Sequence, residues 1–177
     1  MAATNSKPSY WIQYGLAEGR LNSRRLEHQL HTAGFSSADK ASKATVVISH
    51  SGGCLLHVTG KHVMINPTVW PERSFVRKFL NNLVHDLLLE NLLWGMWYLV
   101  THFAYNIRLY RPYLLSNRPQ FHSNETALII RNDQDGWCSP MVEKIYPKAE
   151  IKHLPGSHND CWRHPEEYVK LIVDYAK

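Results

Sequence analysis

The stretch Val46-Val47-Ile48-Ser49-His50-Ser51-Gly52-Gly53 is the part of this 177-residue chain that decides the fold. Three branched apolar residues in succession predict a buried strand over 45–49, and the glycines after it predict a tight turn into a short helix over 52–59. In such a turn the residues two before and two after the central serine must be small, because the backbone doubles back on itself. Here they are Ser49 and Gly53, so the pattern departs from the usual G-x-S-x-G at its first position. An ordinary glycine-bearing turn between a strand and a helix is the alternative.

Short apolar runs alternate with helical patterns along the rest of the chain. The runs predict strands at 10–14, 62–66, 126–131 and 150–154, and the helical patterns cover 23–33, 140–146 and the region from 165 onward. This alternation is typical of an α/β protein with a mostly parallel sheet of about five strands flanked by helices. We expect a single domain over 1–177, with two helices inserted at 71–115 between the third and fourth of the five strands.

Composition excludes several classes of protein. Apolar residues make up 44% of the chain and charged residues 20%, which is enough for a core and argues against disorder. Cys54, Cys138 and Cys161 are widely spaced, without a C-x-x-C pair, so we expect a reducing compartment, the cytoplasm, and not a disulfide framework. Polar and charged residues interrupt the hydrophobic stretch 83–105. Its longest apolar run, 92–100, is shorter than the roughly 20 residues of a membrane span, so none is expected.

The chain is basic and rich in aromatic residues, with a net charge of +5, 11 His, 6 Trp and 9 Tyr. These features fit a nucleic-acid-binding protein, a metalloprotein or an enzyme with an aromatic, histidine-lined site. The basic residues are scattered among the predicted elements, so we expect no nucleic-acid partner. No closely spaced pair of metal-ligating residues accompanies the cysteines, so we expect neither a metal nor another cofactor.

Two loops in the C-terminal part of the chain carry residues that complement Ser51 chemically. A hydroxyl nucleophile needs a base, and the base needs a carboxylate that orients it. The loop after the predicted strand 126–131 contains Asp133 and Asp135, and the loop after 150–154 contains His158. Because the carboxyl ends of parallel strands meet at one edge of a sheet, we expect these side chains near Ser51. Asp160 is a remote third candidate for the acid.

Ser, Asp and His in this chain order, each after its own strand, resemble the catalytic triad of the α/β-hydrolase superfamily. The resemblance extends from residue 10 to the last helix. Tyr14-Gly15-Leu16-Ala17 resembles the family's oxyanion loop, with tyrosine in place of histidine. This match implies an oxyanion hole formed by the backbone N–H groups of Leu16, or Ala17, and Gly52. A proline five residues after Asp135 matches the family's acid loop, which favours Asp135 over Asp133 as the acid.

By this match the chain keeps the catalytic part of the family's sheet and lacks the strands at one edge. The strand at 10–14, which leads into the oxyanion loop, then becomes an exposed edge, and an exposed edge offers a surface for a homodimer. The inserted helices at 71–115 fall where the family often carries a cap over the site. We therefore predict a truncated α/β-hydrolase fold with a helical cap.

The resemblance implies a serine hydrolase that cleaves an ester or thioester bond in a small-molecule acyl substrate. Ser51 is the expected nucleophile, His158 the base and Asp135 the residue that orients it, with an acyl-enzyme as the intermediate. The alternative is a catalytically inactive α/β-hydrolase-like protein that binds a ligand or a partner. The substrate's identity and the choice between hydrolysis and acyl transfer stay open. The residues expected to line the substrate pocket are His50, Trp94, Trp97 and Trp137.

Overall fold

A computed structural model provides the fold. The residues that it describes are 7–15, 18–56, 58–68, 97, 100–104, 107–108, 126–138 and 141–177. Most of the predicted cap at 71–115 lies outside these residues. Within it, residues 97, 100–101, 103–104 and 107–108 are helical. None of the helices that the structure describes has the length and apolarity that crossing a bilayer requires.

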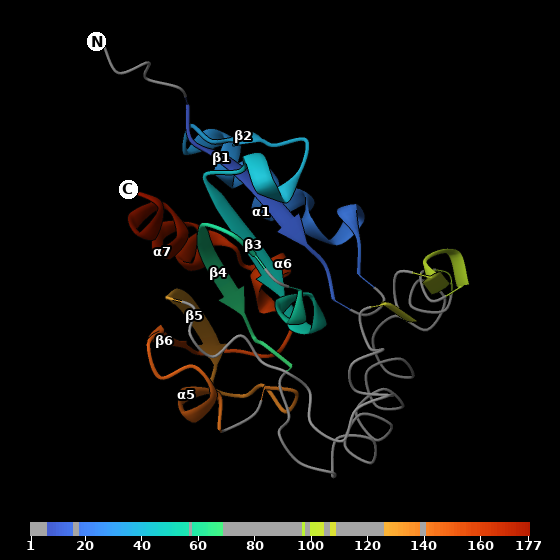
Figure 1. The fold of residues 1–177 in the computed structure, drawn as a ribbon, viewed down its shortest axis with the longest axis vertical. Coiled ribbons are helices and arrows are strands. Elements are labelled where there is room, and N and C mark those ends of the chain that lie inside the picture. The colour runs from blue at the N-terminus through green and yellow to red at the C-terminus, as the bar shows by residue number, and fades with distance from the viewer. Residues whose placement is uncertain are drawn as a thin grey trace.

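A six-stranded parallel sheet forms the centre of the molecule (Figure 1). Its order is β2-β1-β3-β4-β5-β6, with the short β2 (Ser36–Ser37) at one edge. Each longer strand lies within one residue of its prediction, and every pairing is parallel, so the predicted α/β class is confirmed. The longer strands are β1 (Ser9–Gln13), β3 (Val46–His50), β4 (Lys61–Ile65), β5 (Ala127–Asn132) and β6 (Glu150–Leu154).

Strand β2 corrects the expectation of an open edge at β1. The sequence predicts a polar connector over 36–43, but the two residues of β2 pair with Ser9 and Tyr10. The N–H of Ala38 continues this contact by donating to Tyr10 O at 2.8 Å. Two exposed serines do not show the alternation of apolar and polar residues by which a strand is recognised in a sequence. The pairing instead satisfies backbone N–H and C=O groups of β1. The sheet therefore has six strands, and the first two residues of β1 are covered.

Three helices cover one face of the sheet: α1 (Arg20–Thr32), α6 (Asp160–Arg163) and α7 (Glu166–Ala176). Leu26, Trp162 and Ile172, one from each helix, belong to the same buried cluster as Ile48 and Ile130 of the sheet. Short α6 has too few residues to show a helical period, so the sequence does not predict it. Helix α1 begins three residues before its predicted start at 23. Helix α7 begins at Glu166, one residue after its predicted start, with Pro165 as its N-cap.

Two shorter elements, η2 (Ser51–Leu55) and α5 (Val142–Ile145), cover the other face. Cys54, Met64, Ile129 and Val142 form the core there. Strand side chains alternate between faces, so Met64 and Ile129 lie on the opposite face from Ile65 and Ile130. Helices on both faces of the sheet give three layers among the described residues. The helix predicted over 52–59 is a shorter 3-10 turn, because consecutive glycines disfavour an α-helix. A second 3-10 turn, η1 (Ala41–Lys43), precedes β3.

The register of the sheet aligns the carboxyl ends of its strands. Gln13 of β1 pairs with Ser49 of β3, and Asn132 of β5 pairs with Leu154 of β6. The loops that follow these strands therefore leave the sheet along one edge, which is where open α/β sheets carry their ligand and catalytic groups. Ser51, Asp135 and His158 follow β3, β5 and β6 at this edge.

Candidate active site

Ser51 occupies the sharp turn between β3 and η2. Its φ of 53° lies in the left-handed region, where a residue other than glycine is strained, and only 7% of the residue is exposed. This is the backbone geometry of a nucleophile elbow. The strand, the turn and the short helical segment after it thus follow the order that the sequence predicts.

Two glycines allow the end of β1 to approach this turn closely. A Cβ atom on Gly15 would lie 2.7 Å from Ser51 Cβ, and one on Gly53 would lie 2.5 Å from the backbone oxygen of Gln13. Both distances are shorter than real Cβ contacts. Any larger residue at either position would push Ser51 away from the segment that follows β1.

Ser49, which replaces the first glycine of the usual elbow pattern, joins three strands. Its fully buried hydroxyl donates to Gln13 Oε1 at 2.7 Å and lies 2.8 Å from His62 Nε2. A serine hydroxyl has one proton and can also accept, so His62 Nε2 carries the proton of the second bond. The side chain at this position therefore lies within a polar network of β1, β3 and β4, which accounts for the departure from glycine.

Buried Asp135 pairs with His158, which is partly buried. Asp135 Oδ2 lies 2.9 Å from His158 Nδ1, and Asp135 Oδ1 accepts the Trp137 N–H at 2.7 Å. Burial raises the pKa of Asp135, but His158 and the Trp137 N–H outweigh burial and hold this pKa below its usual value. An ionised Asp135 keeps a proton on Nδ1 of His158, which leaves Nε2 free to accept one.

The two other candidate acids have different partners. Asp133 Oδ1 lies 3.0 Å from His153 Nδ1, and both side chains are exposed. Asp160 accepts hydrogen bonds from the backbone N–H and the hydroxyl of Ser157, each at 2.9 Å. Of the three aspartates, Asp135 is the one that contacts His158.

The Ser51 hydroxyl contacts a residue that the sequence analysis missed. Ser51 Oγ lies 3.0 Å from Thr68 Oγ1, and the Thr68 N–H donates to Ser51 O at 3.3 Å. Among the described residues no hydrogen bond joins Ser51 to His158. Thr68 follows β4 at the carboxyl edge of the sheet. Catalytic residues gather at this edge, so its place after a predicted strand could have marked Thr68 as a candidate.

Buried asparagines hold the His158 loop in place. Asn66 Nδ2 donates to His158 O at 2.8 Å, and Asn66 Oδ1 accepts the Asn132 N–H at 2.8 Å. The side chain of Asn132 in turn donates to Ser157 O at 2.5 Å and accepts from the Tyr168 hydroxyl at 2.7 Å. Both asparagines stand at the carboxyl ends of strands, so their positions, although not their contacts, were visible in the sequence.

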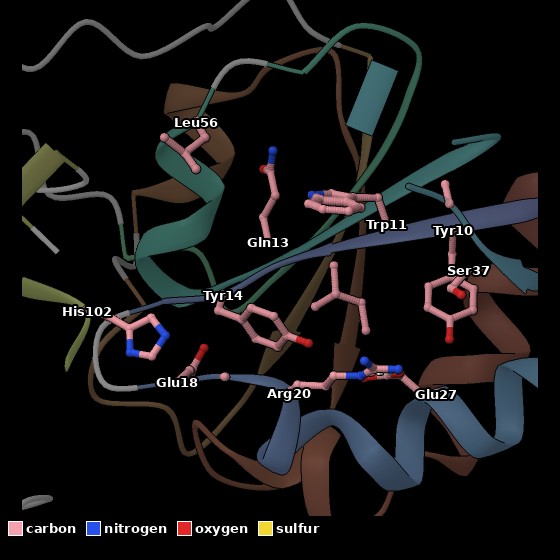
Figure 2. Close-up of a pocket in the computed structure, with 13 residues that line it drawn as sticks. Tyr10, Trp11, Gln13, Tyr14, Glu18, Arg20, Glu27, Ser37, Leu56 and His102 are labelled. Atoms are coloured by element: carbon pink, nitrogen blue, oxygen red, sulfur yellow. Dashed lines mark ion pairs between the residues drawn. The ribbon is translucent and has the colours of Figure 1, made fainter. Parts of the chain in front are cut away.

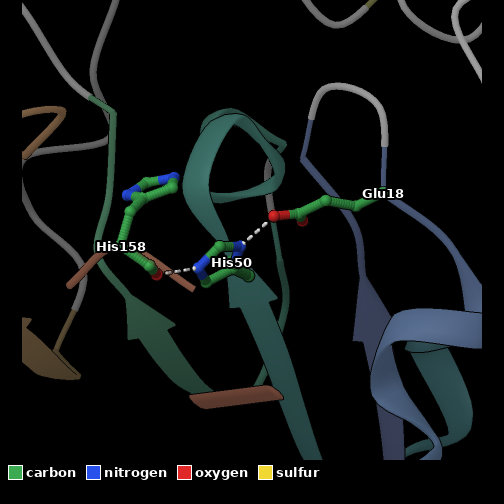
Figure 3. A group of neighbouring side chains, drawn as sticks. All are labelled: Glu18, His50 and His158. Atoms are coloured by element: carbon green, nitrogen blue, oxygen red, sulfur yellow. Dashed lines mark hydrogen bonds and ion pairs between the residues drawn. The ribbon is translucent and has the colours of Figure 1, made fainter. Parts of the chain in front are cut away.

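Glu18 and His50 form an ion pair beside His158 (Figure 3). Glu18 Oε1 lies 2.5 Å from His50 Nδ1, and His50 Nε2 donates to His158 O at 2.8 Å. Burial lowers the pKa of His50, but Cys161 and the Glu18 carboxylate outweigh burial and hold it well above its usual value. Burial raises the pKa of Glu18, but His50 outweighs burial and lowers it. The sequence analysis missed Glu18 altogether.

The same three residues are the group of side chains best placed for a metal ion among the described residues. One ligand atom from each of Glu18, His50 and His158 lies within 4.8 Å of the other two. A cation bound there would have to displace the proton of His50, which the adjacent carboxylate holds. The cysteines contribute no ligand to this group. All three are buried and none forms a disulfide, and Cys54 and Cys138 lie in a different core cluster from Cys161.

The predicted pocket and oxyanion residues have different locations in the structure. Leu16, Ala17 and Trp94 lie outside the described residues, whereas Gly52 lies buried directly after Ser51. His50 is fully buried and Trp97 is 62% exposed. The ring centroid of Trp137 lies 5.8 Å from that of His158, so Trp137 is next to the predicted base.

A cavity of about 630 Å³ runs along β1 and α1 (Figure 2). Glu18 and His102 lie at one end of this cavity, and Tyr10 and Ser37 lie at the other. None of the four residues predicted to form the substrate pocket is among the described residues that line it. Glu18 of the ion pair lines this cavity. The substrate pocket around His50, Trp94, Trp97 and Trp137 stays a prediction.

Neither a scan against protein-family models nor a search of curated proteins finds a match. Solved structures do match. Polyneuridine aldehyde esterase is 11% identical, with 97% of this chain and 100% of that chain covered and a TM-score of 0.61. A carboxylesterase structure from the thaumarchaeon Nitrososphaera gargenis is 11% identical, with 96% and 89% covered and a TM-score of 0.61. The enol-lactonase from Burkholderia xenovorans is 12% identical, with 97% and 92% covered and a TM-score of 0.55.

At these identities the likeness establishes the fold and not the reaction. The chain has the α/β-hydrolase fold, in the truncated form that the sequence predicts. These three solved structures are hydrolases by name, two esterases and a lactonase, whereas another similar structure has non-heme bromoperoxidase in its name.

Proposed function

We propose that this protein is a serine hydrolase that cleaves an ester or thioester bond in a small-molecule acyl substrate. The observation that carries the proposal is the contact of Asp135 with His158. It lies at the carboxyl edge of the sheet, where Ser51 occupies a strained turn. The serine, histidine and aspartate of a catalytic triad are thus present at this edge. Although burial raises the pKa of Asp135, His158 lowers it below its usual value, so the carboxylate is ionised beside the imidazole. The hydrolase names of three similar structures agree with this chemistry.

The reaction proceeds in two halves. His158 Nε2 takes the proton of Ser51 Oγ while this oxygen attacks the substrate carbonyl, and Asp135 stabilises the resulting imidazolium. The backbone N–H groups of Leu16 and Gly52 stabilise the tetrahedral oxyanion. His158 then gives its proton to the leaving alcohol or thiol, and an acyl-enzyme remains. Water repeats the sequence through His158, which releases the acid and restores Ser51.

The hydrogen bond between Ser51 and Thr68 defines the first step of this cycle. Ser51 Oγ lies 3.0 Å from Thr68 Oγ1 in this structure and must come within hydrogen-bond distance of His158 Nε2 before His158 can take its proton. Catalytic hydrogen bonds often form only when substrate is bound. The same contact is the observation that favours the second candidate function, a protein of hydrolase fold that binds a ligand or partner without turning it over.

Labelling with a fluorophosphonate probe distinguishes the two functions. We expect the folded wild-type protein to be labelled and Ser51→Ala to remain unlabelled. Wild-type protein that folds but is not labelled would rule out the serine hydrolase. Turnover of short-chain p-nitrophenyl esters then separates a hydrolase from a protein with a merely reactive serine, and added alcohol acceptors reveal acyl transfer.

Self-association is a separate part of the proposal. Strand β2 covers only the first two residues of β1, and we propose that the remaining edge supports a homodimer. Sedimentation velocity over a range of protein concentrations tests this, because an exclusively monomeric protein contradicts it.

A further inference from the structure

We propose that Glu18 and His50 form a buried tie that couples Gly15 and Glu18 to the loop that carries His158. This inference rests on the proposed function, because Gly15 and Glu18 flank the predicted oxyanion donor Leu16 in the sequence and the loop carries the predicted base. The tie holds these two parts of the reaction centre in one arrangement. Glu18 and His50 are therefore positioning residues and do not contact the reacting atoms.

The first half of the tie is the Glu18 carboxylate. Its Oε2 accepts the N–H of Gly15 at 2.7 Å and so links residues 15 and 18. Its Oε1 lies 2.5 Å from His50 Nδ1 and 3.5 Å from the indole nitrogen of Trp162, which donates to it. Only 9% of the Glu18 side chain is exposed. One carboxylate thus contacts both Gly15, after β1, and His50, at the end of β3.

The second half is the imidazole of His50, whose two nitrogens face two different loops. Nε2 donates to His158 O at 2.8 Å, while Nδ1 faces the Glu18 carboxylate. Nε2 donates to a carbonyl and therefore carries a proton. Against the effect of burial, Cys161 and the Glu18 carboxylate hold the pKa of His50 well above its usual value, so the ring is an imidazolium. The contact of Nδ1 with Glu18 is an ion pair that does not have hydrogen-bond geometry. The ring is fully buried, with its centroid 4.8 Å from the ring of His158 and 4.9 Å from that of Trp162. Its position is therefore set by packing on both sides.

A charged tie suits this location for an electrostatic reason. An isolated imidazolium beside His158 would oppose the positive charge that His158 acquires when it takes the serine proton. The Glu18 carboxylate neutralises His50, so the hydrogen bond to the His158 loop is kept without this penalty. The tie also supports the segment after β1, which lies near the edge of a sheet that lacks the family's outer strands.

Amide hydrogen exchange tests the tie without any substrate. Glu18→Gln keeps the size of the side chain and removes its charge, so we expect faster exchange both at residues 15–18 and at residues 157–160. His50→Asn keeps an amide nitrogen near the position of Nδ1 but has no donor that reaches His158 O. In this variant we expect faster exchange at 157–160 alone. Glu27→Gln makes the same chemical change on α1, where Glu27 contacts Ser23 and Arg20, and should alter neither segment.

The outcomes that overturn the tie are specific. Exchange at 157–160 that stays at the wild-type rate in Glu18→Gln, or in His50→Asn, shows that the loop does not depend on the pair. If Glu18→Gln does not fold, His50→Asn decides the question by the same criterion.

The rate of fluorophosphonate labelling at Ser51 provides the functional readout. Misplacing a catalytic group by about 1 Å can cost on the order of 10²-fold in rate. We expect a loss of about this size in both Glu18→Gln and His50→Asn, and none in Glu27→Gln. A wild-type protein that is not labelled counts against the proposed function, whereas the exchange measurements decide independently whether the tie exists.

Discussion

Asp135 Oδ2 lies 2.9 Å from His158 Nδ1, although 23 residues separate the two in the sequence. Strands β5 and β6 are neighbours in the sheet, and the pairing of Asn132 with Leu154 places the loops after them side by side. Asp133 starts from the same loop but contacts exposed His153. The contrast between the two aspartates leads to a direct test.

Asp135→Asn should lower kcat by about 10⁴-fold, because the amide favours the wrong imidazole tautomer and cannot stabilise the imidazolium. Asp133→Asn is the matched control and should retain nearly wild-type activity. Ester turnover and the rate of Ser51 labelling measure the effect. An equal loss of kcat in the two variants would contradict the assignment of Asp135 as the residue that orients His158.

Stability should fall at acidic pH through the same carboxyl. The pKa of Asp135 is lowered in the folded protein, so its contribution to stability is complete above the ordinary aspartate value of about 3.9 and is lost as the pH falls toward the lowered value. Urea unfolding of wild type at pH 7 and pH 3 measures this loss, which should be smaller in Asp135→Asn. Asp133→Asn should behave like wild type. An undiminished loss in Asp135→Asn would contradict the assignment.

Gly15→Ala should abolish most of the reactivity of Ser51. The added Cβ would lie 2.7 Å from Ser51 Cβ, so the serine or the turn must move, at a cost of about 10²-fold in the labelling rate. Gly136→Ala is the control, because a Cβ there meets nothing within 4 Å. A fully reactive Gly15→Ala protein would mean that this turn yields without disturbing the elbow.

Ser49→Ala should destabilise the protein while the elbow keeps its shape. The change removes the buried hydrogen bonds with Gln13 and His62, and we expect a loss of about 1–3 kcal/mol in the free energy of unfolding. Ser49→Gly restores the usual elbow pattern and should show at least the same loss. Chemical denaturation measures both variants, and unchanged stability in Ser49→Ala would contradict a role for this network.

Thr68→Val removes the hydroxyl that holds Ser51 at rest. A typical hydrogen bond contributes roughly 0.5–1.5 kcal/mol net, so freeing Ser51 Oγ should raise its labelling rate by about 2- to 10-fold. Thr68→Ser keeps a hydroxyl and should stay near the wild-type rate. A slower Thr68→Val protein would indicate instead that Thr68 assists the reaction.

The strands and the elbow were predictable because their signals are local. Branched apolar runs such as 46–48 show which segments are buried in a sheet, and the small residues around Ser51 satisfy a steric requirement that extends over a few residues. Chain order after the strands then indicated His158 and an aspartate. The fold class and the approximate bounds of β1, β3, β4, β5 and β6 follow from the amino-acid sequence alone.

The contacts of the site were decided by the tertiary structure, because they depend on how loops from distant strands orient their side chains. Sequence spacing did not show which of Asp133 and Asp135 contacts His158. It also did not indicate that Thr68 lies beside Ser51 or that Glu18 lies beside His50. Strand β2 was missed because its pairing uses backbone groups that every residue has. What the sequence by itself determined is a truncated parallel sheet with a serine at its elbow. Only the packed structure decided which carboxylate meets His158 and that a buried ion pair lies behind it, since a few ångströms of loop placement determine each contact.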